Sequence, residues 1–134
     1  LGDLALATAQ APFTVGRADA AQQVPALLRE AREAYLASLA LRPSWPRAWA
    51  SLAAVHYGLG DRAAYLAAWQ RAQTLGPNEP DVQSMLLDLA LLDWNQAPAG
   101  MQAWAMKLFE QSDPGRRTAI NQRAQVFGLQ FVDE

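Results

Sequence analysis

Few residues in this chain could do chemistry. His56 is the single histidine and there is no cysteine, so a metal ion would have only carboxylates beside one imidazole. Such a set falls short of a usual transition-metal site. His56 stands beside Tyr57 on an apolar stripe, which favours packing over catalysis. Neither a glycine-rich phosphate loop nor a serine nucleophile motif is present. The sequence predicts a protein that is not an enzyme, with no cofactor and no metal site.

Acidic and aromatic residues have a plainer interpretation than catalysis. Asp81, Asp88 and Asp93 fall on one expected helix, but an acid and base pair needs a buried cleft that no motif indicates. We interpret them as a solvated face. The tryptophans mostly predict packing between helices, although those near expected helix ends could contact a partner or a sugar. The packing positions are Trp49, Trp69 and Trp104, and the end positions are Trp45 and Trp94.

Composition bounds the fold class and the partners. The chain has 134 residues, half of them hydrophobic with many alanines, which favours one all-α domain. A net charge of -2 indicates neither nucleic acid nor an anionic membrane as the partner. No apolar run reaches the roughly 18 to 20 residues of a membrane-spanning helix. The sequence begins at Leu1 rather than methionine, so we expect that a preceding signal or anchor could have been lost, and localisation stays open.

A repeat organises the middle of the chain. The block Pro43-Ser44-Trp45-Pro46 recurs as Pro77-Asn78-Glu79-Pro80. The period of about 34 residues is typical of stacked helical hairpins. Apolar residues at helical spacing predict one helix on each side of Gly60 and Asp61, which supply a helix stop and a helix start. Ser44 and Asn78 are expected N-caps, and the prolines at 46 and 80 suit the first turn.

The residues of this unit resemble a tetratricopeptide repeat. The resemblance rests on Trp49, Leu52-Ala53, Gly60, Trp69, Ala72 and Pro77, while His56 and Tyr65 depart from the pattern. A tyrosine where the family has alanine predicts helices pushed apart or tilted. The resemblance implies an all-α, TPR-like superhelix of stacked antiparallel helix pairs with a C-terminal capping helix.

The whole chain then divides into one domain with four parts. Residues 1–43 are a degenerate first repeat, with a helix over 1–10, a long inserted loop over 11–23, and a second helix from Val24 or Pro25 to Arg42. Residues 46–77 form the second repeat and residues 80–112 a degenerate third. A capping helix occupies 114–128, because its apolar line of Ile120, Ala124 and Phe127 is narrow. The tail from Leu129 either folds back or awaits a partner.

In the resembled family the first helices of the repeats line a concave groove. The corresponding positions here predict a partner-binding groove, and the Lys and Asn clamp of chaperone-binding members is absent from it. An apolar or weakly basic segment, such as a helix, would suit this groove because Asp81 and Asp88 make one wall acidic. The groove residues are Arg47, Ser51, Tyr57, Asp81, Ser84, Met85, Asp88 and Leu91.

The predicted function is a non-catalytic scaffold or adaptor that binds a protein or peptide. The run LRPSWPRAWASLA followed by LGPNEPDVQ is also similar to repeat-containing accessory proteins of bacterial exopolysaccharide synthesis and export. That resemblance implies a periplasmic or membrane-anchored location, and otherwise a cytoplasmic one. Two alternatives remain open. One is a structural or oligomerising module, and the other a helical domain that binds a small molecule or carbohydrate through the 11–23 loop and Trp45.

Overall fold

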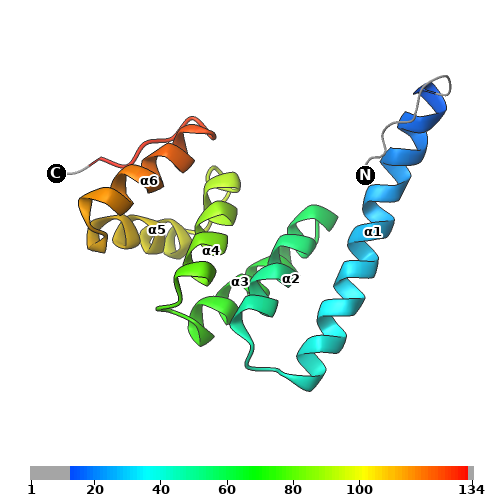
Figure 1. The fold of residues 1–134 in the computed structure, drawn as a ribbon, viewed down its shortest axis with the longest axis horizontal. Helices are drawn as coiled ribbons and strands as arrows, with labels where there is room; N and C mark the ends of the chain where they lie inside the picture. The colour runs from blue at the N-terminus through cyan, green and yellow to red at the C-terminus, as the bar shows by residue number, and fades with distance from the viewer. Residues whose placement is uncertain (1–12, 133–134) are drawn as a thin grey trace.

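The computed structural model describes residues 13–132, which form helices joined by short turns (Figure 1). The prediction of an all-α fold is confirmed, because the described residues contain no strand. Neighbouring helices pack in pairs along the chain, and α4 also contacts α2. The helices are α1 (Phe13–Leu41), α2 (Pro46–Leu59), α3 (Arg62–Leu75), α4 (Pro80–Leu92), α5 (Ala99–Gln111) and α6 (Pro114–Gln125).

The hairpin of α2 and α3 turns at the two residues that the sequence indicated. Gly60 ends α2 in the left-handed conformation with φ of 77°, which a residue without Cβ adopts readily. Asp61 begins α3, and its carboxylate accepts a hydrogen bond of 3.2 Å from the Ala64 amide, as an N-cap residue does. The N-caps of α2 and α4 differ from the prediction. Trp45 and Glu79 occupy those positions without a side-chain hydrogen bond, so Ser44 and Asn78 are not the caps.

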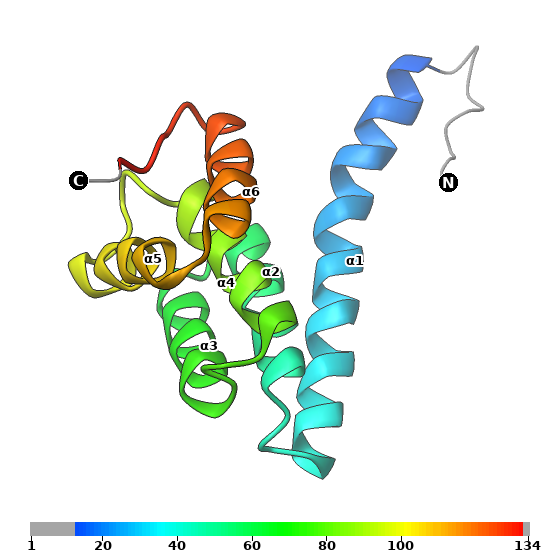
Figure 2. The ribbon, with the colours of Figure 1, turned by 60° about the vertical axis from the view of Figure 1, so that its left-hand side comes forward.

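The first helix contradicts the loop predicted over 11–23. From Phe13 onward this segment is helical and continues unbroken through Pro25 to Leu41 (Figures 1 and 2). A proline inside a helix removes one backbone hydrogen bond, and here that loss does not end the helix. Alanine, arginine and glutamine are strong helix formers and are frequent between 17 and 23. The helix expected over 1–10 lies outside the described residues.

Two apolar clusters share α4. The first lies among α2, α3 and α4 and includes Leu52, Tyr65, Trp69 and Leu86. The second begins at Leu87, on the other side of α4, and continues through the inner faces of α5 and α6. Consecutive residues of one helix point about 100° apart, so Leu86 and Leu87 reach different clusters. α4 therefore joins the regular hairpin to the C-terminal half.

Tyr65 fills the place of the small residue expected in this unit. Its side chain is fully buried, and its ring packs edge to face on Tyr57 with centroids 5.1 Å apart. Its hydroxyl lies 3.4 Å from the Leu89 carbonyl oxygen and 3.6 Å from the Met101 sulfur. Burial raises the pKa of this phenol, which keeps it protonated as a donor.

The end of the chain folds back on α5 and α6. Asp113 caps α6, accepting a hydrogen bond of 2.8 Å from the Arg116 amide. α6 ends at Gln125, earlier than the predicted 128, and buries Ile120 and Ala124 while Phe127 is 38% exposed.

In the part of the chain that the structure describes, none of the helices combines the length and the apolar character needed to cross a bilayer.

Candidate functional site

The helices α2, α4 and α6 form a row with a regular spacing along the sequence. Pro46, Pro80 and Pro114 open the three helices, each 34 positions after the last. Side chains then bridge neighbours in the row at nearly the same sequence separation. They are Arg47 with Asp81 at 3.4 Å, Arg116 with Gln83 at 2.8 Å, and Arg123 with Asp88 at 2.8 Å. α6 thus occupies the place that the first helix of a further repeat would take beside α4.

The ion pairs change the expected electrostatics of this face. Asp81 pairs with Arg47, and Asp88 accepts two hydrogen bonds from Arg123. The second contact raises the pKa of Arg123 through the hydrogen bond and the charge of Asp88. The two aspartates that the sequence predicted to form an acidic wall are therefore each paired with an arginine of the same chain. The sequence contains both arginines, but it does not reveal that residues about 34 positions apart become neighbours.

The predicted groove residues do not all reach the surface. Leu91 is only 2% exposed, because it packs in the second apolar cluster under α5 and α6. It is unable to contact a partner, and that assignment is corrected. Its neighbour Leu92 is 50% exposed and lies on the open side of α4. The other predicted residues are exposed at Arg47 and Asp81 and half-buried at Ser51, Tyr57, Ser84, Met85 and Asp88.

A recess of about 360 Å³ adjoins this row at the turn between α2 and α3. Tyr57 and Leu92 line it together with the polar side chains of Arg62, Asn95 and Gln96. It thus places two apolar side chains next to polar groups, which is a usual composition for a binding recess. Sequence reasoning missed this recess because its walls come from the ends of three helices.

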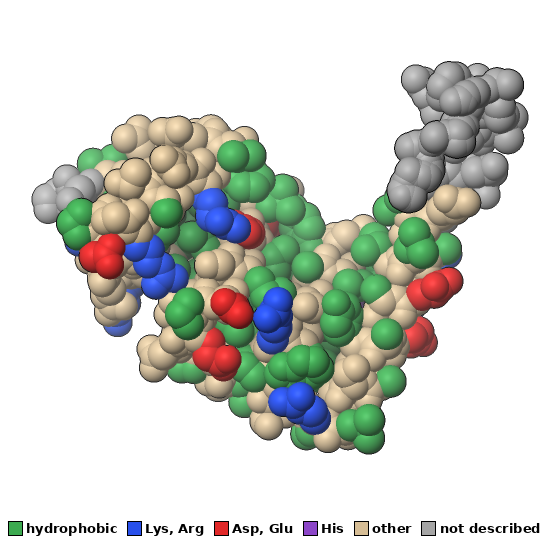
Figure 3. All heavy atoms as spheres, in the orientation of Figure 1, with side chains coloured by type: hydrophobic (Ala, Val, Ile, Leu, Met, Phe, Trp, Pro, Cys, Tyr) green, Lys and Arg blue, Asp and Glu red, His purple; other side chains and the backbone are tan. Residues whose placement is uncertain are grey.

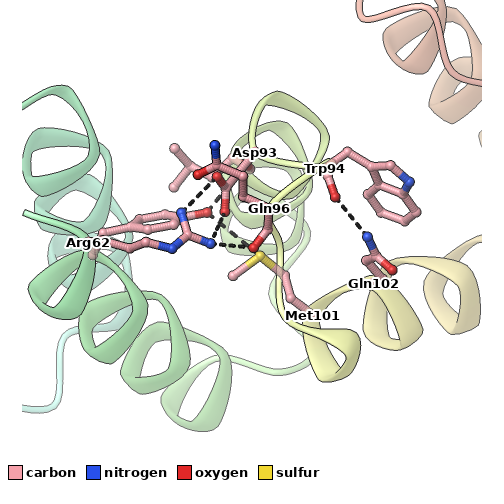
Figure 4. Close-up of polar contacts among 8 residues, drawn as sticks. Arg62, Asp93, Trp94, Gln96, Met101 and Gln102 are labelled. Carbon is pink, nitrogen blue, oxygen red and sulfur yellow. Dashed lines mark hydrogen bonds and ion pairs between the residues drawn. The ribbon is translucent and has the colours of Figure 1, made fainter. Parts of the chain in front are cut away.

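One wall of the recess is fixed by a forked ion pair (Figure 4). Arg62, at the start of α3, donates two hydrogen bonds of 2.9 and 3.1 Å to the carboxylate of Asp93, which is 5% exposed. Arg62 also donates to the carbonyl oxygen of Gln96. The Asp93 hydrogen bond is the largest cause of the raised pKa of Arg62. Asp93 therefore ties α3 to the turn after α4, rather than lying on the solvated face that the sequence predicted.

His56 occupies a packing position, as expected. Its side chain is 8% exposed, and its Nδ1 is buried without a hydrogen-bond partner among the described residues. Burial lowers the pKa of His56 despite the opposing charge of Asp61, so the neutral imidazole is favoured. Over residues 13–132, His, Asp and Glu side chains form no group of three that could hold a metal ion.

The tryptophan side chains all contact other residues of this chain. Trp69 donates a hydrogen bond of 3.0 Å to the Leu86 carbonyl oxygen and packs edge to face on Trp104 at 5.1 Å. Trp49 donates to the Pro43 carbonyl oxygen at 2.8 Å. Of the two at helix ends, Trp45 lies beneath Arg42 and Trp94 packs edge to face on Phe131.

The tail provides a second recess, of about 590 Å³, between α5 and residues 129–132. Phe131 stacks on Phe109 with centroids 5.2 Å apart, and Asn121 exchanges hydrogen bonds of 2.7 and 3.2 Å with the Phe131 backbone. Of the two options predicted for the tail, these contacts bear out the one in which it folds back. The apolar residues Leu129, Phe131 and Val132 were the signal for it.

Comparison with known proteins supports the repeat resemblance at a distance. The chain is 28% identical over 157 aligned residues to the Hsp70-Hsp90 organizing protein of Triticum aestivum. The alignment covers 91% of this chain and 27% of the wheat protein, so the chain spans about a quarter of that relative. No known family profile and no solved structure matches the chain. The six described helices, packed in pairs, are consistent with a tetratricopeptide-like arrangement.

Proposed function

We propose that this chain is a non-catalytic protein-binding module that holds a segment of another protein on the face of α2, α4 and α6. The observation that carries the proposal is the row itself, in which half-buried and exposed side chains adjoin the recess at Tyr57 and Leu92. A partner helix could place apolar side chains on Leu92 and Met85. The distant similarity to an organizing protein supports a protein as the partner.

The partner segment is apolar rather than basic. Asp81 and Asp88 are the acidic residues predicted to attract a basic segment, and each is already paired with an arginine of the same face. Attraction of a further cation would have to compete with these contacts. Apolar burial therefore supplies the main driving force, and we expect association to depend weakly on salt.

The wheat relative's name makes Hsp70 and Hsp90 the first proteins to test. Chaperone-binding members of the resembled family hold a terminal carboxylate with Lys and Asn, whereas the groove positions of this chain, among them Ala50, Ala54, Ser84 and Asp88, contain neither residue. A partner of this chain would accordingly bind through side chains rather than through its terminal carboxylate. The exopolysaccharide role remains a prediction from the sequence, and the similarity found does not extend to it.

The test compares two matched substitutions of exposed apolar residues. Leu92→Glu lies on the proposed face, and Met106→Glu lies on α5 with a similar exposure of 46% against 50%. The wild type and both variants are tagged, and each is used to capture proteins from a lysate of the source organism. Each is then titrated with Hsp70 and with Hsp90 to measure affinity. We expect Leu92→Glu to weaken association at least tenfold, which corresponds to about 1.4 kcal/mol.

Both variants should melt at the same temperature as the wild type, because neither residue is buried. Met106→Glu should retain every partner of the wild type. If Leu92→Glu captures the same proteins with the same affinity as Met106→Glu, the proposed face is wrong.

A further inference from the structure

The first helix carries the same register of prolines as the rest of the chain. Pro12 stands 34 positions before Pro46, as Pro46 stands before Pro80 and Pro80 before Pro114. Pro12 lies outside the described residues, and α1 begins directly after it at Phe13. Positions 13–25 of α1 thus correspond to α2, and positions 28–41 correspond to α3. One unbroken helix contains both halves of a repeat that elsewhere folds as a hairpin.

The missing turn explains why this hairpin stays open. Gly60 and Asp61 end α2 and begin α3, and their equivalents 34 positions earlier are Ala26 and Leu27. Alanine resists the left-handed conformation, and leucine has no oxygen with which to cap a helix. Pro25 lies within α1 and does not end it. The local sequence therefore favours a continuous helix over a turn.

The continuous helix leaves a site without its expected occupant. α2 packs on both α3 and α4, so the first helix of the preceding repeat would pack on α2 and on positions 28–41 of α1. Instead the beginning of α1 extends beyond α2 (Figures 1 and 2), and the space-filling view is hollowed between α1 and the other helices (Figure 3). Around this site Val24 and Leu27 of α1 are 55% and 60% exposed. On α2, Ala54 and Gly58 are both exposed.

We propose that two copies of this chain exchange the beginning of α1. Residues 13–25 of one copy would pack on α2 and on positions 28–41 of the other, and the two-fold relation would fill both sites at once. The occupant is a second copy because the register places this segment, and no other described one, at the site. A continuous helix is unable to fold back on its own chain, whereas exchange between copies leaves every helix intact.

Disulfide trapping tests the exchange directly, since the chain has no cysteine. Ala20 and Ala54 are 34 positions apart, the separation of the bridging pair Arg47 and Asp81. A tagged Ala20→Cys chain is mixed with an untagged Ala54→Cys chain and oxidised. We expect a disulfide between the two copies, and a wild type of twice the chain mass by light scattering. Leu41→Cys, at the far end of α1, should not form a disulfide with Ala54→Cys.

Three results would overturn the proposal. The first is a wild type that remains monomeric at all accessible concentrations. The second is a dimer in which the Ala20→Cys and Ala54→Cys chains do not join. The third is a disulfide within one chain when both cysteines are present, because it would show that α1 bends and closes on its own copy.

A transplanted turn provides the complementary test. Ala26→Gly with Leu27→Asp places the turn residues of Gly60 and Asp61 in α1 at the same register. We expect this variant to be a monomer, and the disulfide between positions 20 and 54 to form within one chain. Met106→Asp, on α5 and 46% exposed, is the control for the added charge and should remain a dimer. A transplanted variant that dimerises as well as the control would contradict the exchange.

Discussion

The first described helix, α1, and the hairpin of α2 and α3 have the same register but different structures. The hairpin turns at Gly60 and Asp61, and its Tyr65 and Trp69 are buried in the first apolar cluster. The α1 segment has no equivalent turn and remains one helix with exposed apolar residues. Two turn residues thus decide whether a segment in this register can close on itself.

The largest expected effect comes from removing an aromatic side chain at the same repeat position in both regions. Trp69→Ala should lower the free energy of unfolding by about 3 to 5 kcal/mol, because it leaves a cavity between α3 and α4. Tyr35 stands 34 positions earlier and is half-buried, so Tyr35→Ala should cost about 1 to 2 kcal/mol. Urea denaturation followed by circular dichroism measures both values. Equal losses would mean that the two regions are equally packed in solution.

An intermediate effect is expected from exchanging glycine and alanine at the turn positions. Gly60→Ala should destabilise by about 1 to 2 kcal/mol through backbone strain alone, since a Cβ there would meet no atom within 4 Å. The reverse change in α1, Ala26→Gly, should destabilise by about 0.5 to 1 kcal/mol because it loosens a helix interior. Thermal melts of both variants measure these losses. An unchanged melting temperature for Gly60→Ala would show that the left-handed turn is not needed.

The smallest effect concerns the pH dependence of stability, and it arises in the hairpin, because His56 lies on α2. Burial lowers the pKa of His56, so the unfolded chain binds its proton more readily than the folded chain does. The contribution of His56 to stability is therefore full above the ordinary pKa of 6.5 and is lost as pH falls below it. His56→Gln should remove this part of the decline in melting temperature. If the wild type and the variant lose stability equally between neutral and mildly acidic pH, His56 is not the group responsible.

Much of the fold could be predicted because its signals are local. Proline positions marked the starts of α2, α4 and α6, and Gly60 with Asp61 marked the turn between α2 and α3. The loop predicted over 11–23 was wrong. That prediction placed Pro25 in the first turn of a new helix, whereas a helix that has already formed can continue through a proline. Pro12 and Pro114 share the register of Pro46 and Pro80, and this pattern was available in the sequence.

The candidate site was less predictable because it depends on neighbours from distant parts of the chain. Leu91 and Leu92 look alike in the sequence, yet one is buried and the other is half exposed. Which of them faces solvent is decided by α5 and α6, which cover one side of α4. The same holds for Asp88, since its arginine partner lies 35 positions later. The fold class can be predicted from patterns of nearby residues. The exposure and the charge pairing of surface residues depend instead on which helices pack against each other.

The bridges between helices also bear on how the chain folds. Those that join α2 to α4, α3 to the turn after α4, and α4 to α6 connect residues only 31 to 35 positions apart. Short chain closures have a small entropic cost, so each unit can assemble on its neighbour without waiting for the two ends to meet. Assembly would then begin at the α2 and α3 hairpin and spread outward in both directions. Amide hydrogen exchange should accordingly be slowest in these two helices.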